Sequence, residues 1–164
     1  MRLFRYSILL FLIMFYSCGN LKQLIKKNHK KTSTFFEELS KKNGNAFSVR
    51  SNYINTSYVW TYKKKLIIIY KIQNGKILNK QTEVKGDLDW LNASYKDSEM
   101  YSDCFELDGD LISYKTLLNG EYISDDIPVN IDCFISKDYK NDFYFNIAND
   151  ISTYNLLDNL MKNQ

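Results

Sequence analysis

The chain has 164 residues, of which 45% are apolar and 25% are charged, and its formal net charge at pH 7 is +3. This length and composition predict one folded globular domain, and they exclude a polytopic membrane protein and a wholly disordered chain. With one histidine and three cysteines in the whole chain, zinc sites built from Cys/His clusters are excluded and histidine-based catalysis is not expected.

The first twenty residues have the layout of a secretory signal peptide. Arg2 and Arg5 form a basic start, an apolar run follows over residues 6–16, and Ser17 stands directly before Cys18. The apolar run has about eleven residues, whereas a transmembrane helix needs about 20. A permanent membrane span is therefore not expected.

The stretch Phe15-Tyr16-Ser17-Cys18 resembles the lipobox of bacterial lipoproteins, in which the cysteine after the cleavage site is lipidated. Ser17 and Cys18 agree with that pattern, while Phe15 and Tyr16 stand where the family usually has leucine and a small residue. The resemblance implies that residues 1–17 are removed as a signal peptide and that lipid on Cys18 holds the protein on a membrane. An uncleaved N-terminal anchor and a simple secreted protein are the alternatives.

The residues after Cys18 bear on the location of the protein. Gly19 rather than aspartate follows the cysteine, and by resemblance to the lipoprotein sorting rule this favours the outer membrane. No acidic cluster resembling a surface-export tag follows, so we expect the protein to face the periplasm. Several acyl chains together would form an effectively permanent anchor.

Residues 18–31 are expected to be a lipidated cysteine and a basic tether. Residues 20–31 contain five lysines and His29, and when extended they reach at most about 40 to 43 Å. A polybasic patch pressed against anionic head groups is the alternative interpretation. The folded domain would then comprise residues 32–164.

The first helix is expected to begin at Thr34. Thr34 and Glu37 fit a capping box, residues 35, 36 and 39 are apolar, and Asn43-Gly44 is a stop signal. This pattern predicts a short amphipathic helix that packs on a sheet.

The middle of the chain is rich in β-branched and aromatic residues that are separated by turn signals. Asn74-Gly75, Asp108-Gly109 and Asn119-Gly120 each predict a tight hairpin, because both central positions of such a turn must accept a positive φ. The lysine triplet at residues 63–65 predicts a further turn, protected against aggregation at a sheet edge. The predicted strands cover residues 58–62, 66–72, 76–84, 100–107, 111–117, 122–123, 129–135 and 143–147.

A second helix is expected near the C-terminus, capped by Asn149 or Asp150 and continuing to residue 161. Together these elements predict the α+β class: an antiparallel β-meander of six to eight strands with an N-terminal and a C-terminal helix packed on it.

The charges are divided unevenly along the chain. Residues 20–86 contain fifteen basic and three acidic residues, whereas residues 87–164 contain five and sixteen. The opposed charges either neutralise one another across paired strands, or they lie on opposite sides and make the protein a dipole that steers a basic partner. Both arrangements are open from the sequence alone.

Two cysteines lie in the predicted domain. Cys104 and Cys133 each occur in the setting Asp-Cys-Phe, and an oxidising periplasm permits a disulfide between them. The alternative is two buried thiols that act as small hydrophobic side chains.

The acidic half supplies the candidate partner-binding residues Asp108, Asp110, Asp125 and Asp126, because turns project from a sheet and tolerate unpaired charge. Their spacing lacks the alternating carboxylates and terminal glutamate of an EF-hand loop, so no metal or other cofactor is expected. Asp87 and Asp89 form a carboxylate pair of the kind that an acidic stretch contains by chance.

The sequence favours a protein that works by binding a protein partner and is not an enzyme. An accessory subunit of an envelope complex and a toxin-neutralising immunity protein both fit a small chain without a catalytic set. A glycan- or small-ligand-binding lipoprotein is the alternative, because aromatic residues make up 15% of the chain, and a cryptic hydrolase is a third hypothesis. Nucleic acid is not an expected partner, because a periplasmic location argues against it.

Overall fold

The computed structural model describes residues 2–86, 88–92, 102–154 and 156, and for residues 2–18 it describes the backbone alone. The elements are, in chain order, α1 (Arg2–Asn43), β1 (Asn45–Arg50), β2 (Thr56–Lys63), β3 (Leu66–Gln73), β4 (Lys76–Val84), the 3-10 helices η1 (Asp89–Asn92) and η3 (Ser102–Cys104), β5 (Phe105–Leu118), β6 (Glu121–Val129), α2 (Ile131–Ser136) and α3 (Asp142–Thr153).

The six strands form one antiparallel sheet in the order β4-β3-β2-β1-β5-β6. The predicted α+β class is therefore confirmed, with an N-terminal helix, an antiparallel sheet and a C-terminal helix. The meander holds from β1 to β4, after which β5 returns to pair with β1. As a result β4 and β6 are the two edges of the sheet.

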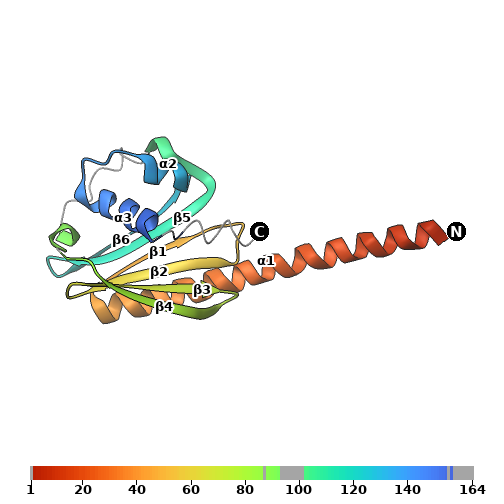
Figure 1. Ribbon diagram of the computed structural model, residues 1–164, viewed down its shortest axis with the longest axis horizontal. Helices are drawn as coiled ribbons and strands as arrows, with labels where there is room; N and C mark the ends of the chain where they lie inside the picture. The colour runs from red at the N-terminus through yellow and green to blue at the C-terminus, as the bar shows by residue number, and fades with distance from the viewer. Residues whose placement is uncertain (1, 87, 93–101, 155, 157–164) are drawn as a thin grey trace.

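The sheet lies between two helical layers, with α1 on one face and α3 with α2 on the other (Figure 1). On the α3 face, Phe47 and Trp60 stack at 5.7 Å and belong to the larger core. On the α1 face, Phe36 and Leu39 pack against Ala46 in a smaller core. Alternate residues of each strand point to opposite faces, so each strand contributes to both layers.

Two of the predicted hairpins are confirmed. Asn74 and Gly75 have φ angles of 53° and 73°, and Asn119 and Gly120 have φ angles of 53° and 87°. These left-handed pairs match the right-handed twist of the strands that they join. The lysine triplet also lies at a turn, between β2 and β3.

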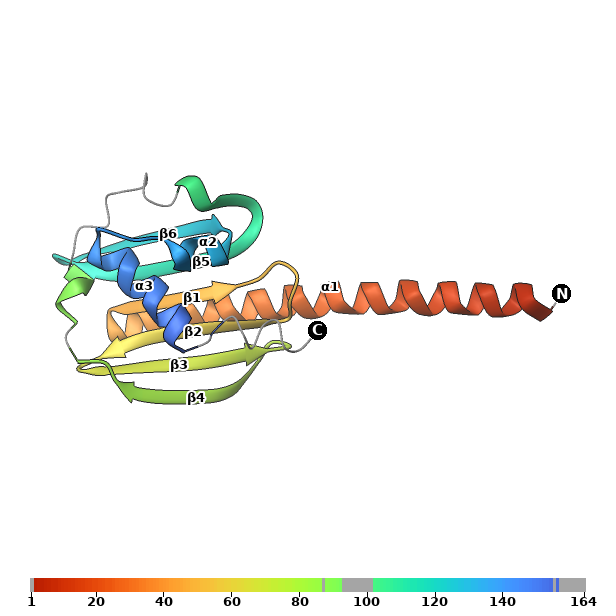
Figure 2. The same ribbon diagram turned by 45° about the horizontal axis from the view of Figure 1, so that its top comes forward.

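The expectation of an extended tether is wrong, because residues 20–31 are helical and belong to α1. Lysine, leucine and glutamine are good helix formers, and the stretch from residue 20 to residue 43 contains neither glycine nor proline. The sheet also binds this part of the helix: Asn28 Nδ2 donates to Ser57 Oγ at 3.0 Å, and Asn28 Oδ1 accepts from Gly75 N at 3.1 Å. Figure 2 shows the N-terminal part of α1 projecting past the sheet.

The predicted N-terminus of the first helix is wrong, and its predicted C-terminus is confirmed. Thr34 does not cap a helix N-terminus, since its hydroxyl donates to the carbonyl of Lys30 one turn earlier, at 2.9 Å. The stop at Asn43-Gly44 is confirmed, because Gly44 has a φ of 78° and its amide donates to Ser40 O at 2.8 Å.

The predicted hairpin at Asp108-Gly109 is wrong, because both residues lie inside β5. Val129 of β6 pairs with Phe105 and also with Asp110, so residues 106–109 bulge out of the ladder. Glycine at position 109 lets the backbones of β5 and β6 approach closely, because a Cβ at this position would lie 2.5 Å from Val129 O. A glycine inside a strand often marks such a bulge.

Two predicted strands are helices. Residues 131–135 belong to α2, where Asn130 caps the helix by accepting from Cys133 N at 3.0 Å. Residues 143–147 belong to α3, where Asn141 accepts from Phe143 N at 2.8 Å. Their β-branched and aromatic content suggested strands, but the two asparagine caps and the helical spacing of the buried residues prevail.

The C-terminal helix begins earlier than expected. Asp150 lies in the last part of α3 and is not its cap. Residues 155 and 157–161 of the predicted helix, like residues 100–101 of a predicted strand and Asp87, lie outside the described residues.

Candidate partner-binding groove

The strand order separates the two charge types. Residues 45–86 contain eight basic residues and one acidic residue, whereas residues 102–153 contain three and eleven. Only β1 and β5 pair across the two groups, so basic strands form one side of the sheet and acidic strands the other. None of the three ion pairs among the described residues joins two strands. Among the described residues, the opposite charges are therefore mostly separated across the sheet and are not paired between neighbouring strands.

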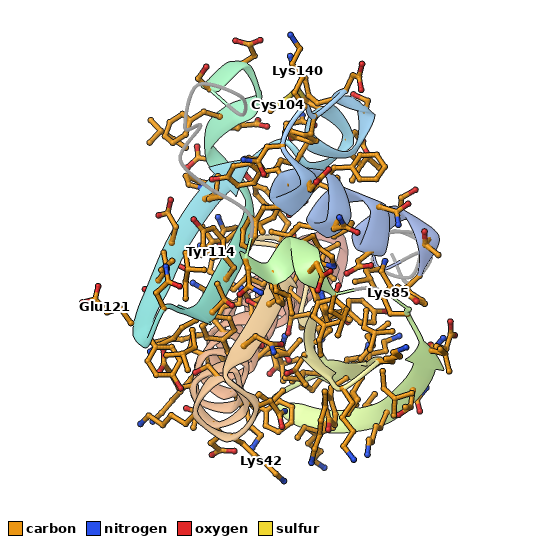
Figure 3. The ribbon with its side chains drawn as sticks, turned by 90° about the vertical axis from the view of Figure 1, so that its left-hand side faces the viewer. Lys42, Lys85, Cys104, Tyr114, Glu121 and Lys140 are labelled. Carbon is orange, nitrogen blue, oxygen red and sulfur yellow. A yellow bond between two sulfur atoms is a disulfide. The ribbon has the colours of Figure 1, made fainter. Side chains whose placement is uncertain are left out.

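A groove lies between α1 and the acidic side of the sheet. The helix packs on β1 and β2 and leaves the same face of β5 and β6 open, and Figure 3 shows this view along the helix with Glu121 at the outer edge. Two cavities of about 110 and 350 Å3 adjoin there and share Phe36, Glu37 and Asp126. The other lining residues are Ser33, Ser48, Arg50, Ser113, Tyr114, Ser124 and Asp125.

One cation, Arg50, lines the floor of this groove. Its Nη1 donates to Ser33 Oγ at 2.8 Å, which ties β1 to α1. Burial lowers the pKa of Arg50, and the nearby carboxylate of Asp126 opposes this shift. Because arginine stays charged in proteins, the groove presents a half-buried cation beside an acidic rim.

Lys115 closes one end of the groove. Its ammonium lies 2.7 Å from Glu37 Oε2 and 5.4 Å from the centre of the Tyr122 ring. The Tyr122 hydroxyl in turn donates to Ser40 O at 3.2 Å. These contacts join β5 and β6 to α1. Lys115 is the one basic residue of the two strands, and its ammonium already contacts Glu37.

Strand β6 forms the outer rim. Glu121, Asp125 and Asp126 are all exposed. Asp126 pairs with Ser113 on the α1 face, and Asp125 pairs with Tyr114, whose side chain belongs to the core on the opposite face. The two carboxylates therefore border the edge from both sides, which makes it an acidic edge strand.

The other two predicted aspartates lie elsewhere. Asp108 is exposed in the bulge of β5, and Asp110 is half-buried at its end. Burial raises the pKa of Asp110, a hydrogen bond from Ser51 opposes this, and the charges of Asp132 and Glu106 add to the rise. The structure thus brings Asp125 and Asp126 to the groove and leaves Asp108 and Asp110 at the bulged, open end of the hairpin.

The three cysteines lie in three different helical elements, and two of them are bonded to each other. Cys104 and Cys133 form a disulfide with an S–S distance of 1.98 Å, which ties η3 to α2. The backbone of Cys18 lies within α1.

Most of the described tyrosines in the predicted strands belong to the core, as is usual for strand residues. Tyr62, Tyr114 and Tyr144 are buried, Tyr70 is half-buried and Tyr122 is exposed, while Tyr101 lies outside the described residues. A shallow pocket of about 210 Å3 on the α3 face is lined by Tyr58, Ile69, Lys71, Asn79, Gln81, Tyr154 and Leu156.

A buried ion pair was missed by the sequence analysis. Lys85, directly after β4, contacts the carboxylate of Asp150 in α3, and the Asp150 side chain is 0% exposed (Figure 3 labels Lys85). Burial raises the pKa of Asp150, whereas the contact with the ammonium of Lys85 favours the charged carboxylate. Burial also lowers the pKa of Lys85. The two residues are far apart in the sequence, so no local pattern could have indicated them.

Three further observations bear on function. Among residues whose side chains are described, no three histidine, cysteine, aspartate or glutamate residues gather as they would around a metal ion. In the described part of the chain, no helix is both long enough and apolar enough to cross a membrane. Comparison with protein-family models, curated proteins and solved structures finds no match.

Proposed function

We propose that this chain is a non-catalytic lipoprotein of the outer membrane, attached through Cys18 and facing the periplasm, that binds a basic protein partner along β6. The observation that carries the binding proposal is the acidic edge strand beside an open groove. Glu121, Asp125 and Asp126 are exposed there, and the one lysine of β5 and β6 already contacts Glu37.

The groove offers two kinds of contact to such a partner. The acidic rim attracts a basic segment over a distance and raises its association rate. The outer backbone edge of β6 can then pair with an extended segment, as sheet edges do in strand addition. Pro128 has no amide hydrogen, so this pairing would be confined to residues 121–127. Arg50 would bind a carbonyl or carboxylate of the same segment.

This surface would serve either an accessory subunit of an envelope complex or a toxin-neutralising immunity protein. A second candidate is a glycan-binding lipoprotein, and the observation that favours it is the pocket with Tyr58, Tyr154, Asn79 and Gln81. Amides and aromatic rings together fit a sugar. Oligosaccharide-induced NMR shifts that vanish in Asn79→Leu and Gln81→Leu would favour this candidate.

The test is cross-linking of the tagged full chain in intact cells, followed by identification of the bound proteins. We expect one protein with a basic surface to be recovered with the wild type and lost with the double variant Asp125→Lys, Asp126→Lys. Reversing two charges should slow association at low salt by at least about tenfold.

The matched control is the double variant Glu38→Lys, Asp138→Lys, which makes the same change in net charge at exposed sites that do not line the groove. It should retain the partner. Equal loss of the partner in both variants would show that only net charge matters, and retention in both would remove the groove from the proposal.

A further inference from the structure

The opposite flank of α1 has a different surface, formed by β3 and the edge strand β4. All nine residues of β4 are exposed. Large apolar side chains are among them: Val84 is 77% exposed and Leu78 57%, and Ile77 and Leu66 are exposed nearby. Apolar residues this exposed on an edge strand mark either an interaction site or a place where aggregation must be prevented.

Lysines surround these apolar residues. Lys63, Lys64 and Lys65 lie at the turn before β3, and Lys76 and Lys80 lie on β4. All five are exposed, and none forms an ion pair with another described residue. Glu83 is the single acidic residue in residues 45–86. We call these five lysines with Leu66, Ile77, Leu78 and Val84 the basic-apolar flank.

Part of this flank points to the same side as α1. Lys80 pairs with Tyr70 and Val84 pairs with Leu66 in the ladder. The Tyr70 ring contacts Phe35 of α1 edge-on at 4.9 Å, which fixes the side on which this row lies. Lys80 and Val84 therefore lie on the same side of the sheet as α1.

The position of α1 suggests what covers this flank. The helix packs on β1 and β2 beside this flank, and its N-terminal part continues beyond the sheet toward the apolar residues 6–16 (Figures 1 and 2). Lysines on α1, at positions 22, 26, 27, 30 and 31, continue the basic surface in that direction. Apolar side chains among lysines, beside the segment that leads to a membrane attachment, are typical of a protein surface that lies on a lipid interface.

We infer that the basic-apolar flank lies on an anionic phospholipid surface, with the lysines at the head groups and Val84, Leu78 and Leu66 at the acyl boundary. The inference rests on the proposed function only for attachment of the N-terminus to a membrane. Contact on this flank turns the acidic β6 edge away from the lipid, where like charge would repel it. A basic partner can then reach the groove.

The test uses the full chain, reconstituted through its N-terminal apolar segment into vesicles of phosphatidylcholine with or without phosphatidylglycerol. An amine-reactive reagent labels the lysines, and mass spectrometry gives the rate at each one. We expect the lysines at positions 63–65, 76 and 80 to react several-fold more slowly when phosphatidylglycerol is present. Lys137 and Lys140, on the acidic half, should react equally in both vesicles.

The variant Lys76→Glu, Lys80→Glu should restore labelling of the lysine triplet to its rate on phosphatidylcholine. The control variant Lys137→Glu, Lys140→Glu should leave the protection unchanged. Equal labelling rates in both kinds of vesicle, or protection that survives Lys76→Glu, Lys80→Glu, would overturn the inference. Neither acylation of Cys18 nor a protein partner is needed, so these outcomes are independent of the proposed partner binding.

Discussion

The two flanks of α1 share one face of one sheet and differ in nearly every other respect. Toward β6 the surface is a groove with a serine-lined floor, a half-buried Arg50 and an acidic rim. Toward β4 the surface carries lysines and exposed apolar side chains. The helix divides a face that would otherwise be continuous.

This difference follows from the order of the strands in the sheet. The basic residues precede β5 and the acidic residues follow it, and the sheet adds β5 and β6 at the side of β1 instead of beyond β4. The uneven charge of the sequence therefore becomes an uneven charge of the surface. The two proposed contacts, with a basic protein and with an anionic lipid surface, therefore lie on separate flanks of α1.

The largest expected effect concerns the buried ion pair that joins the two halves. Asp150→Ala should lower the free energy of unfolding by about 3–5 kcal/mol, because it leaves the ammonium of Lys85 buried without its partner. The measurement is urea unfolding followed by tryptophan fluorescence. The double variant Lys85→Met, Asp150→Leu should recover most of the loss. A loss below about 1 kcal/mol in Asp150→Ala would show that the halves do not depend on this pair.

The disulfide stabilises the acidic half alone. Cys104 and Cys133 are separated by 29 residues, and a loop of this size contributes about 3–4 kcal/mol in the chain-entropy model. Cys104→Ser, Cys133→Ser should lose about this much stability. Thiol titration of the denatured, unlipidated chain without reductant should find one thiol, that of Cys18. Three titratable thiols would refute the bridge.

The bulge of β5 gives a sharper test of the acidic side. Gly109→Ala should cost about 1–3 kcal/mol, because the added Cβ would lie 2.5 Å from a backbone oxygen of Val129, which cannot rotate away. Thermal unfolding measures the loss. Gly19→Ala, where nothing lies within 4 Å, is the control and should not destabilise the protein. Equal behaviour of the two variants would show that the bulge adapts easily.

The smallest effect is expected at the exposed contact between α1 and β5. Glu37→Gln should cost less than about 1 kcal/mol, because the Glu37 side chain is 47% exposed and surface ion pairs contribute little. Chemical unfolding at low and high salt measures this. A larger loss would mean that Lys115 and Glu37 hold the acidic hairpin against the helix.

Local signals predicted the parts of the fold that local geometry decides. Asn74-Gly75 and Asn119-Gly120 form the hairpins that their need for positive φ implies. Asp108-Gly109 carries the same signal and forms no hairpin, because Phe105 and Asp110 both pair with Val129 and residues 106–109 bulge out of the ladder instead. Nothing within the dipeptide distinguishes the two outcomes.

The groove was less predictable than the fold. Asp125 and Asp126 were singled out as acidic turn residues, and they lie inside β6. Arg50 was not singled out and Glu37 was considered only as a capping residue, since β1 was not predicted and the groove exists only where α1, β1 and β6 come together. Such a site depends on strand order, and a single sequence contains no local signal for strand order.

The continuity of α1 changes the mechanics of attachment. Ten residues separate Cys18 from Asn28, where the sheet first holds the helix, and as a helix they span about 15 Å instead of the about 33–36 Å of an extended chain. A flexible leash would let the body sample a hemisphere of positions, and every encounter with a partner would begin with a rotational search. With the proposed attachment through Cys18, a helical arm would transmit orientation from the lipid to the sheet, so the groove would meet its proposed partner from one side.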